Sequence, residues 1–94
     1  MRKIVRDKIP FLASGLRFEK VSREEACRLL VDKLFEEAEE FRKSSNPEEL
    51  ADLLEVIEAL GQCLGLKWEE LMEIKERKRR ERGGFEKGWV LVGG

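Results

Sequence analysis

Two stretches with helical apolar periodicity, each introduced by a capping sequence, constrain the fold of this chain more than any other feature. The two capping sequences are Ser22-Arg23-Glu24-Glu25 and Asn46-Pro47-Glu48-Glu49. At the start of a helix, a Ser or Asn side chain accepts a hydrogen bond from a free backbone N–H group. A Glu three residues later can accept one in return from the backbone N–H of that Ser or Asn, and proline suits the first helical turn. The pattern predicts helices over about 23–43 and 47–64, and the short break at Ser44-Ser45 predicts that they pair as an antiparallel hairpin.

The rest of the chain predicts a further helix and two arms. A third helix is expected over about 68–82, and a short one near the start of the chain is expected to end at about Ser14. Segments 16–21 and 85–92 alternate enough to predict short strands or extended arms. The predicted fold class is therefore all-α, an antiparallel helical hairpin plus a third helix with short extended arms at both ends, in a single domain over residues 1–94.

Length and charge limit the partners that this chain can have. A domain of 94 residues has a thin core, so we expect a second copy to complete a helical bundle, as a homodimer or homotetramer. Lys and Arg total 19 against 20 Asp and Glu, so there is no broad basic field and nucleic acid is not an expected partner. No apolar run reaches the roughly 20 residues of a membrane span, which predicts a cytoplasmic protein without a membrane partner. Cys27 and Cys63 are expected to be buried, reduced thiols.

Four carboxylates interrupt or border the apolar stripes of the two long helices. At about 100° per residue, Glu37 falls inside the stripe of the first helix and Glu40 lies about 60° to its side. Glu49 and Asp52 repeat this arrangement on the second helix. Packing the stripes together would collect these carboxylates in apolar surroundings, where they cannot all stay charged without a cation. An interfacial salt bridge is the competing explanation for the two acids that lie inside the stripes.

The candidate ligands are all hard oxygen donors. Such donors suit Mg²⁺ or Mn²⁺, whereas Zn²⁺ prefers His and Cys, and the chain has no His. Because the chain has no His, a proton transfer at such a site would have to involve a carboxylate such as Glu36 or Glu40, or hydroxide on the metal. The sequence predicts a magnesium site between the two helices.

Two acidic segments resemble a known enzyme family. They are Lys33-Leu34-Phe35-Glu36-Glu37-Ala38-Glu39-Glu40 and Glu48-Glu49-Leu50-Ala51-Asp52. They are similar to the K-L-x-E-E-A-x-E and E-E-x-x-D segments of the MazG-like superfamily of all-α nucleoside triphosphate pyrophosphohydrolases, which includes phosphoribosyl-ATP pyrophosphohydrolase. Segments 5–10 (VRDKIP) and 81–85 (ERGGF) look like the flanks of a small house-cleaning branch, so the resemblance covers most of the chain.

The resemblance implies roles for particular residues. The metal ligands would be Glu37, Glu40, Glu49 and Asp52, with Glu36 as a supporting group or a base for water. The reaction would be Mg²⁺-dependent hydrolysis of a nucleoside triphosphate to its monophosphate and pyrophosphate. The substrate stays open between dUTP, a damaged purine nucleotide and phosphoribosyl-ATP, and Arg6 and Lys8 would bind the extra phosphate of the last if their arm folds over the site.

Basic residues crowd the last predicted helix. Lys75, Lys78 and Arg82 recur at spacings of three and four residues, so they share one side of it and would reach triphosphate oxygens beside the metal. By resemblance, Lys78 and Arg82 are the first choices. A solvated ion-pair face accounts for the other cations. Two alternatives remain open, a helical module that binds nucleic acid through this segment and a non-catalytic helical oligomer that kept the fold without the activity.

Overall fold

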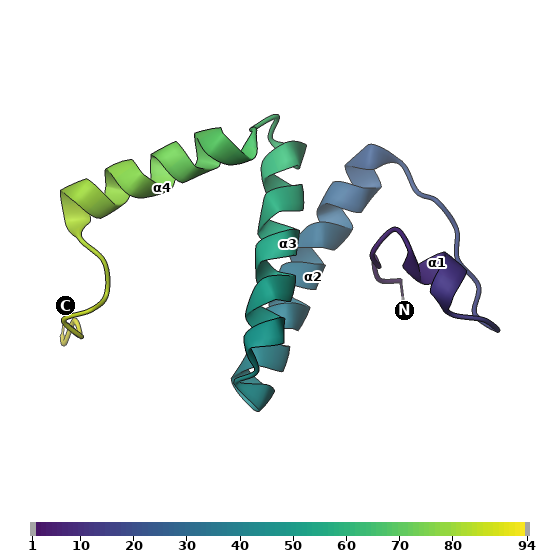
Figure 1. The fold of residues 1–94 in the computed structure, drawn as a ribbon, viewed down its shortest axis with the longest axis horizontal. Coiled ribbons are helices and arrows are strands. Elements are labelled where there is room, and N and C mark those ends of the chain that lie inside the picture. The colour runs from purple at the N-terminus through teal and green to yellow at the C-terminus, as the bar shows by residue number, and fades with distance from the viewer. Residues whose placement is uncertain (1, 94) are drawn as a thin grey trace.

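The computed structural model describes residues 2–93 and is all-helical (Figure 1). Its helices are α1 (Ile9–Leu12), α2 (Arg23–Ser44), α3 (Pro47–Cys63) and α4 (Trp68–Arg82). Within this described range there is no strand. The all-α prediction and the three long helices are therefore confirmed, whereas the strand alternative for segments 16–21 and 85–92 is wrong.

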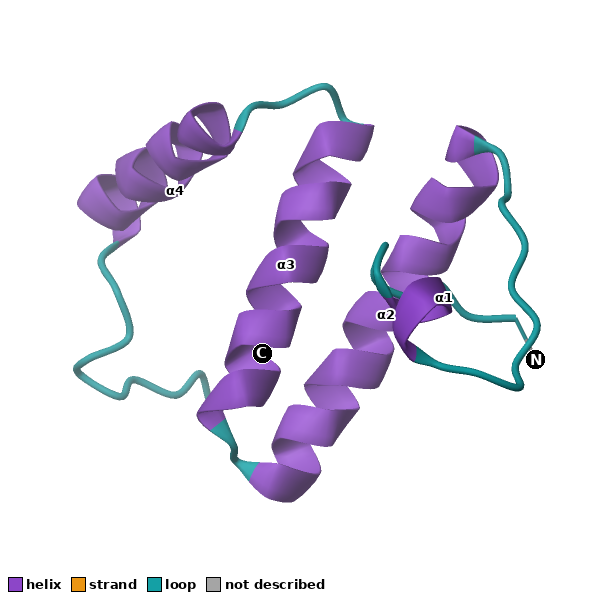
Figure 2. Ribbon diagram, turned by 45° about the vertical axis from the view of Figure 1, so that its right-hand side comes forward, coloured by secondary structure: helices purple, strands orange, loops and turns teal. Residues whose placement is uncertain are grey.

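Helices α2 and α3 begin where the capping sequences predict. The Ser22 hydroxyl accepts a hydrogen bond from the backbone N–H of Glu25 at 3.1 Å, and the Asn46 side chain accepts one from Glu48 at 3.0 Å. Between the helices, Ser45 takes a left-handed conformation with φ 52°, which ends α2 and reverses the chain within two residues. The two helices lie side by side as an antiparallel hairpin (Figure 2), which confirms that prediction.

The interior of the hairpin is small. Val56 is the only hydrophobic side chain of residues 2–93 that is buried, with 7% of its surface exposed. Several apolar residues of α2 and α3 stay at the surface, among them Leu50, Leu54 and Val31 with 46%, 55% and 44% exposed. The stripes are thus wider than the contact between two helices, and part of each faces outward.

A disulfide joins the open end of the hairpin. Cys27 and Cys63 are bonded, with their Cα atoms 6.0 Å apart. The prediction of two reduced thiols is therefore wrong. Each cysteine taken alone fits the buried side of its own helix. The two positions are, however, equidistant from Ser45 along the chain, and an antiparallel pair of helices places such positions opposite each other.

The N-terminal segment with α1 and helix α4 lie on opposite sides of the hairpin (Figure 1). The N-terminal segment and α1 lie beside α2 and α3, and α1 ends at Leu12, earlier than expected. Helix α4 extends away from the hairpin and contacts only α3, after a turn in which Gly65 has φ 76°. None of the helices within residues 2–93 combines the length and apolarity that crossing a lipid bilayer requires.

Candidate metal centre

Three of the four predicted ligands meet between α2 and α3. One carboxylate oxygen from each of Glu37, Glu49 and Asp52 lies within 4.8 Å of the others. Glu37 comes from the middle of α2, and the other two come from the first two turns of α3. Glu40, one turn further along α2, is exposed and lies outside this group, so the structure brings three of the predicted four together.

The Glu37 carboxylate is the buried member of the cluster. Only 8% of the residue is exposed, and it is the one charged residue of the described chain that is buried. The Lys33 ammonium lies one turn earlier on α2, at 3.4 Å from a Glu37 oxygen. A buried charge needs such a partner, and the i,i+4 spacing on one helix supplies it without crossing to another element.

Burial and neighbouring carboxylates both raise the pKa of Glu49. Partial burial raises the pKa of the Glu49 carboxyl, and a hydrogen bond with Glu37 and the charges of Glu37, Asp52 and Glu40 raise it further. Neighbouring carboxylates resist ionising together, so they favour either a shared proton or a cation between them. The cluster consists of oxygen donors only, which fits a small hard divalent cation such as Mg²⁺ or Mn²⁺.

Glu36 is engaged elsewhere. It accepts a hydrogen bond from the Lys33 ammonium at 2.7 Å and lies 3.5 Å from the Lys3 ammonium. The Lys33 hydrogen bond is the main reason that the pKa of Glu36 lies below its ordinary value. Partial burial opposes the charge on Lys33, but its bonds to Glu36 and Glu37 outweigh this and raise the pKa of Lys33. These contacts fix Lys33 beside the cluster and make Glu36 a weak base.

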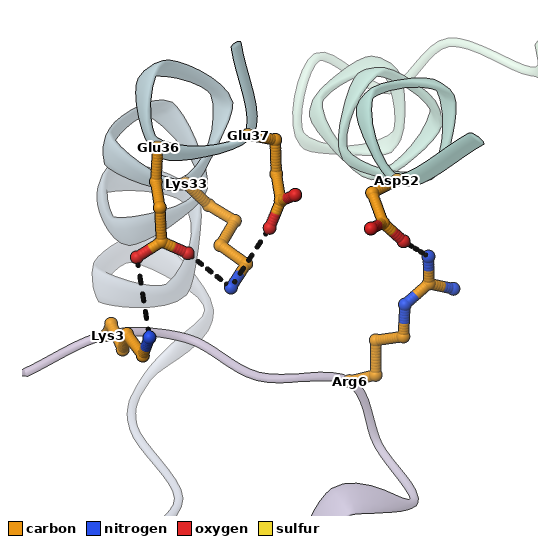
Figure 3. A network of polar contacts seen from close by, with 6 residues as sticks. All are labelled: Lys3, Arg6, Lys33, Glu36, Glu37 and Asp52. Carbon is orange, nitrogen blue, oxygen red and sulfur yellow. Dashed lines mark hydrogen bonds and ion pairs between the residues drawn. The ribbon is translucent and has the colours of Figure 1, made fainter. Parts of the chain in front are cut away.

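The N-terminal segment crosses the cluster and closes one side of a groove. Figure 3 shows this segment passing from α2 to α3, with Lys3 reaching Glu36 and Arg6 reaching Asp52. The guanidinium of Arg6 donates to the Asp52 carboxylate at 2.6 Å. The groove has a volume of about 730 Å³, with residues 3–9 on one wall and residues of α2 and α3, including Glu37 and Asp52, on the other.

The basic residues of α4 are not part of this groove. Lys75, Lys78 and Arg82 are exposed on a helix that points away from the hairpin, and none of them lines the groove. One copy of the chain therefore does not bring them to the acidic cluster, and their role in binding phosphate stays a prediction. The shallow hollow along α4, about 440 Å³, is lined by Met72, Glu73, Glu76, Arg77 and Arg80, all from one helix.

The cations that do reach the cluster come from elsewhere in the chain. Lys33 was not among the predicted site residues, although its spacing of four residues before Glu37 is a signal visible in the sequence. Arg6 was expected near the site only if its arm folded over, and the structure places it there.

Comparisons with known protein families, with curated proteins and with solved structures found no match to this chain. The functional argument therefore depends on the residues and their geometry.

Proposed function

We propose that this chain is a Mg²⁺-dependent nucleoside triphosphate pyrophosphohydrolase of the MazG-like kind, which removes noncanonical nucleotides by releasing pyrophosphate and a nucleoside monophosphate. The observation that carries the proposal is the meeting of Glu37, Glu49 and Asp52, whose oxygens lie within 4.8 Å of one another. These acids belong to the E-x-x-E and E-x-x-D segments on which the resemblance depends. Acidic clusters are common on charged helices, so the support comes from the burial of Glu37 together with the groove beside it.

Different residues would bind the metal, position its ligands and accept the proton in the proposed reaction. Glu37, Glu49 and Asp52 hold the cation, and Glu40, at the exposed edge of the cluster, is the fourth carboxylate available to it. A bound Mg²⁺ supplies positive charge that stabilises the phosphates in the transition state. Lys33, whose ammonium lies 3.4 Å from a Glu37 oxygen, holds that side chain in place. Glu40 suits the role of proton acceptor for water better than Glu36, because Glu36 is already paired with Lys33 and Lys3.

A second copy of the chain belongs to this proposal. The hairpin exposes apolar side chains on both helices, including Phe35 on α2 with 70% exposed and Leu54 on α3 with 55%. A homodimer or homotetramer would bury these surfaces and complete a helical bundle, with the segments before α2 and after α4 as arms that reach the partner. Such an assembly also gives Lys75, Lys78 and Arg82 a route to the groove of another copy.

A cytoplasmic location is part of the proposal, since that is where nucleoside triphosphates are made and used. Disulfides are rare in the cytosol of mesophiles but frequent inside hyperthermophiles. Charged residues make up 41% of this chain, a bias that resembles thermophile proteins. A thermophilic source reconciles the bonded cysteines with an intracellular enzyme.

The test is pyrophosphate release by the purified chain, measured across canonical and modified nucleoside triphosphates and phosphoribosyl-ATP, with Mg²⁺ and with a chelator. We expect Mg²⁺-dependent release that Glu37→Gln and Asp52→Asn each reduce by at least about a hundredfold, as for loss of a group that holds the catalytic charge. Glu39→Gln and Asp32→Asn are the matched controls, because both residues are exposed on α2 outside the cluster. Release that survives the chelator or both cluster substitutions would refute the proposed site.

Phosphoribosyl-ATP is kept as the second candidate substrate because Arg6 and Lys8 line the groove, where an additional phosphate would need cations. Absence of release from every substrate would favour a non-catalytic helical oligomer instead.

A further inference from the structure

The two walls of the groove differ in net charge. The wall made by residues 3–9 carries three cations and one acid, Lys3, Arg6, Lys8 and Asp7. The wall made by the hairpin carries three acids and one cation, Glu37, Asp52, Glu55 and Lys33. A cation bound to a polyphosphate needs both kinds of wall, acidic ligands for the metal and basic groups for phosphate oxygens that the metal leaves free. Within the described chain, the cations that line this groove come from the N-terminal segment and from Lys33, and none comes from α4.

The two cations that neutralise the cluster are held differently. Lys33 projects from the middle of α2, its side chain is 19% exposed, and it bonds Glu36 and Glu37 together. Arg6 lies in the irregular segment before α1, its side chain is 55% exposed, and in the described structure its one ion pair is with Asp52. Lys33 is therefore fixed by its helix, whereas Arg6 can leave Asp52 by a movement of a surface loop.

We propose that Arg6 is an exchangeable counter-ion: it neutralises Asp52 in the metal-free protein and transfers to the polyphosphate of the substrate when a divalent cation takes over Asp52. The inference deepens the proposed function and rests on it. A metal at the cluster makes the positive charge of Arg6 redundant at Asp52, and the guanidinium then lies on the wall that faces the groove. Its planar set of N–H donors matches phosphate oxygens, which a lysine serves only as a point charge.

The proposal predicts opposite changes at two binding steps when Arg6 loses its charge. Arg6→Gln removes a competitor for Asp52, so binding of Mn²⁺ alone should become about two- to fivefold tighter, the scale of a partly exposed ion pair. Binding of inorganic tripolyphosphate to the Mn²⁺-loaded protein should become about tenfold weaker or more, because a charge-assisted phosphate contact is lost. Tripolyphosphate is the probe because it carries no base and so does not depend on which nucleotide is the substrate.

Mn²⁺ binding is measured by the loss of the electron paramagnetic resonance signal of the free ion, and tripolyphosphate binding by calorimetry. Arg2→Gln is the matched control, since it removes the same charge from the same segment while Arg2 pairs with Glu19 and Glu25 outside the groove. It should change neither step by more than about twofold, the size of a screened long-range effect. Arg6→Lys keeps the positive charge but lacks the planar set of N–H donors. It should therefore leave Mn²⁺ binding near that of the wild type and bind tripolyphosphate more tightly than Arg6→Gln but more weakly than the wild type.

Unchanged tripolyphosphate binding in Arg6→Gln would overturn the proposal, and so would equal changes in Arg2→Gln, which would reduce the effect to net charge. These outcomes leave the metal site intact. Failure of the wild-type chain to bind Mn²⁺ would instead overturn the proposed function, and the inference with it, so the two failures are distinguishable.

Discussion

The hairpin of α2 and α3 and the region from α4 to the end of the described chain are both rich in charged residues but have very different structures. The hairpin contains the buried Val56, the buried Glu37, the disulfide and the acidic cluster. The second region contains no buried residue, and it includes the most exposed apolar side chains, Phe85 at 99% and Leu91 at 93%. The difference shows that the content of charged residues does not determine which parts of this chain bury side chains. Burial occurs where the apolar stripe of one helix packs against that of another.

The reason lies in the apolar pattern of each helix. Helices α2 and α3 each carry an apolar stripe along their length, and each stripe meets the other. In α4 the apolar residues stop at Ile74, and residues 75–82 are all charged. Its first turns lie near α3, where Leu71 approaches Gly61, and the rest has nothing apolar to bury. Helix α4 is therefore a helix by propensity and capping more than by packing.

The disulfide gives the largest expected effect on this comparison. Replacing both Cys27 and Cys63 by Ser should lower the free energy of unfolding by about 4 kcal/mol, because the bond closes a long loop and restricts the unfolded chain. The two cysteines are 36 residues apart, and the bond crosses the hairpin only, so α4 should contribute nothing to this loss. Urea denaturation of the wild type with and without reductant is the matching measurement. Two titratable thiols in the unreduced, denatured wild type would contradict the bonded state.

The buried valine gives the next largest effect. Val56→Ala should cost about 2 kcal/mol of stability, since it removes buried methyl groups from a core that has few others. Val90→Ala is the matched control in the second region, where 76% of the residue is exposed, and it should change the stability by less than about 0.5 kcal/mol. Denaturation of both variants by urea compares them. Equal losses would mean that residues 85–92 pack as firmly as the hairpin does, against the exposure seen for them.

The helices and most of the cluster could be predicted because both follow from local periodicity. The caps Ser22 and Asn46 predicted two helix starts. The wheel placed both Glu37 and Glu49 inside the apolar stripes, and the structure buries Glu37 and leaves Glu49 partly exposed. Glu40 lies one turn further along α2, and the structure leaves it exposed, with its charge among those that raise the pKa of Glu49 on α3. A helical wheel places Glu40 and Asp52 alike, each about 60° to the side of an acid inside the stripe, so it cannot predict that only Asp52 joins the cluster.

The features that sequence reasoning missed depend on relations between elements. The disulfide follows from the register of the hairpin, which no single helix contains. The direction of α4 depends on the turn at Gly65, whose φ of 76° sets where the next helix points. The approach of Arg6 to Asp52 joins residues 46 positions apart through an irregular segment, for which periodicity gives no information. Local patterns thus predicted the parts of the site, and the contacts between distant segments had to be observed.

The smallest expected effect tests how loosely the second region is held. A hydrogen bond from Arg79 at 2.6 Å is the main reason that the pKa of Glu86 lies below its ordinary value of 4.5. A carboxyl with a lowered pKa stabilises the folded state above its ordinary pKa, and this contribution disappears as the pH falls below 4.5 towards the folded-state pKa. Because Glu86 and Arg79 are exposed, the stabilisation should be small and confined to the end of α4.

Nuclear magnetic resonance titration of the Glu86 carboxyl measures this pair directly. In Arg79→Gln the pKa of Glu86 should rise towards 4.5, whereas Arg80→Gln, a matched loss of charge one position along α4, should leave the pKa lowered. Neither substitution should change the stability of the hairpin, because the hydrogen bond and ion pair of Arg79 in the described structure are with Glu86 and not with α2 or α3. A loss of hairpin stability in Arg79→Gln alone would show that α4 and its following segment support the hairpin, and the contrast between the two regions would then fail.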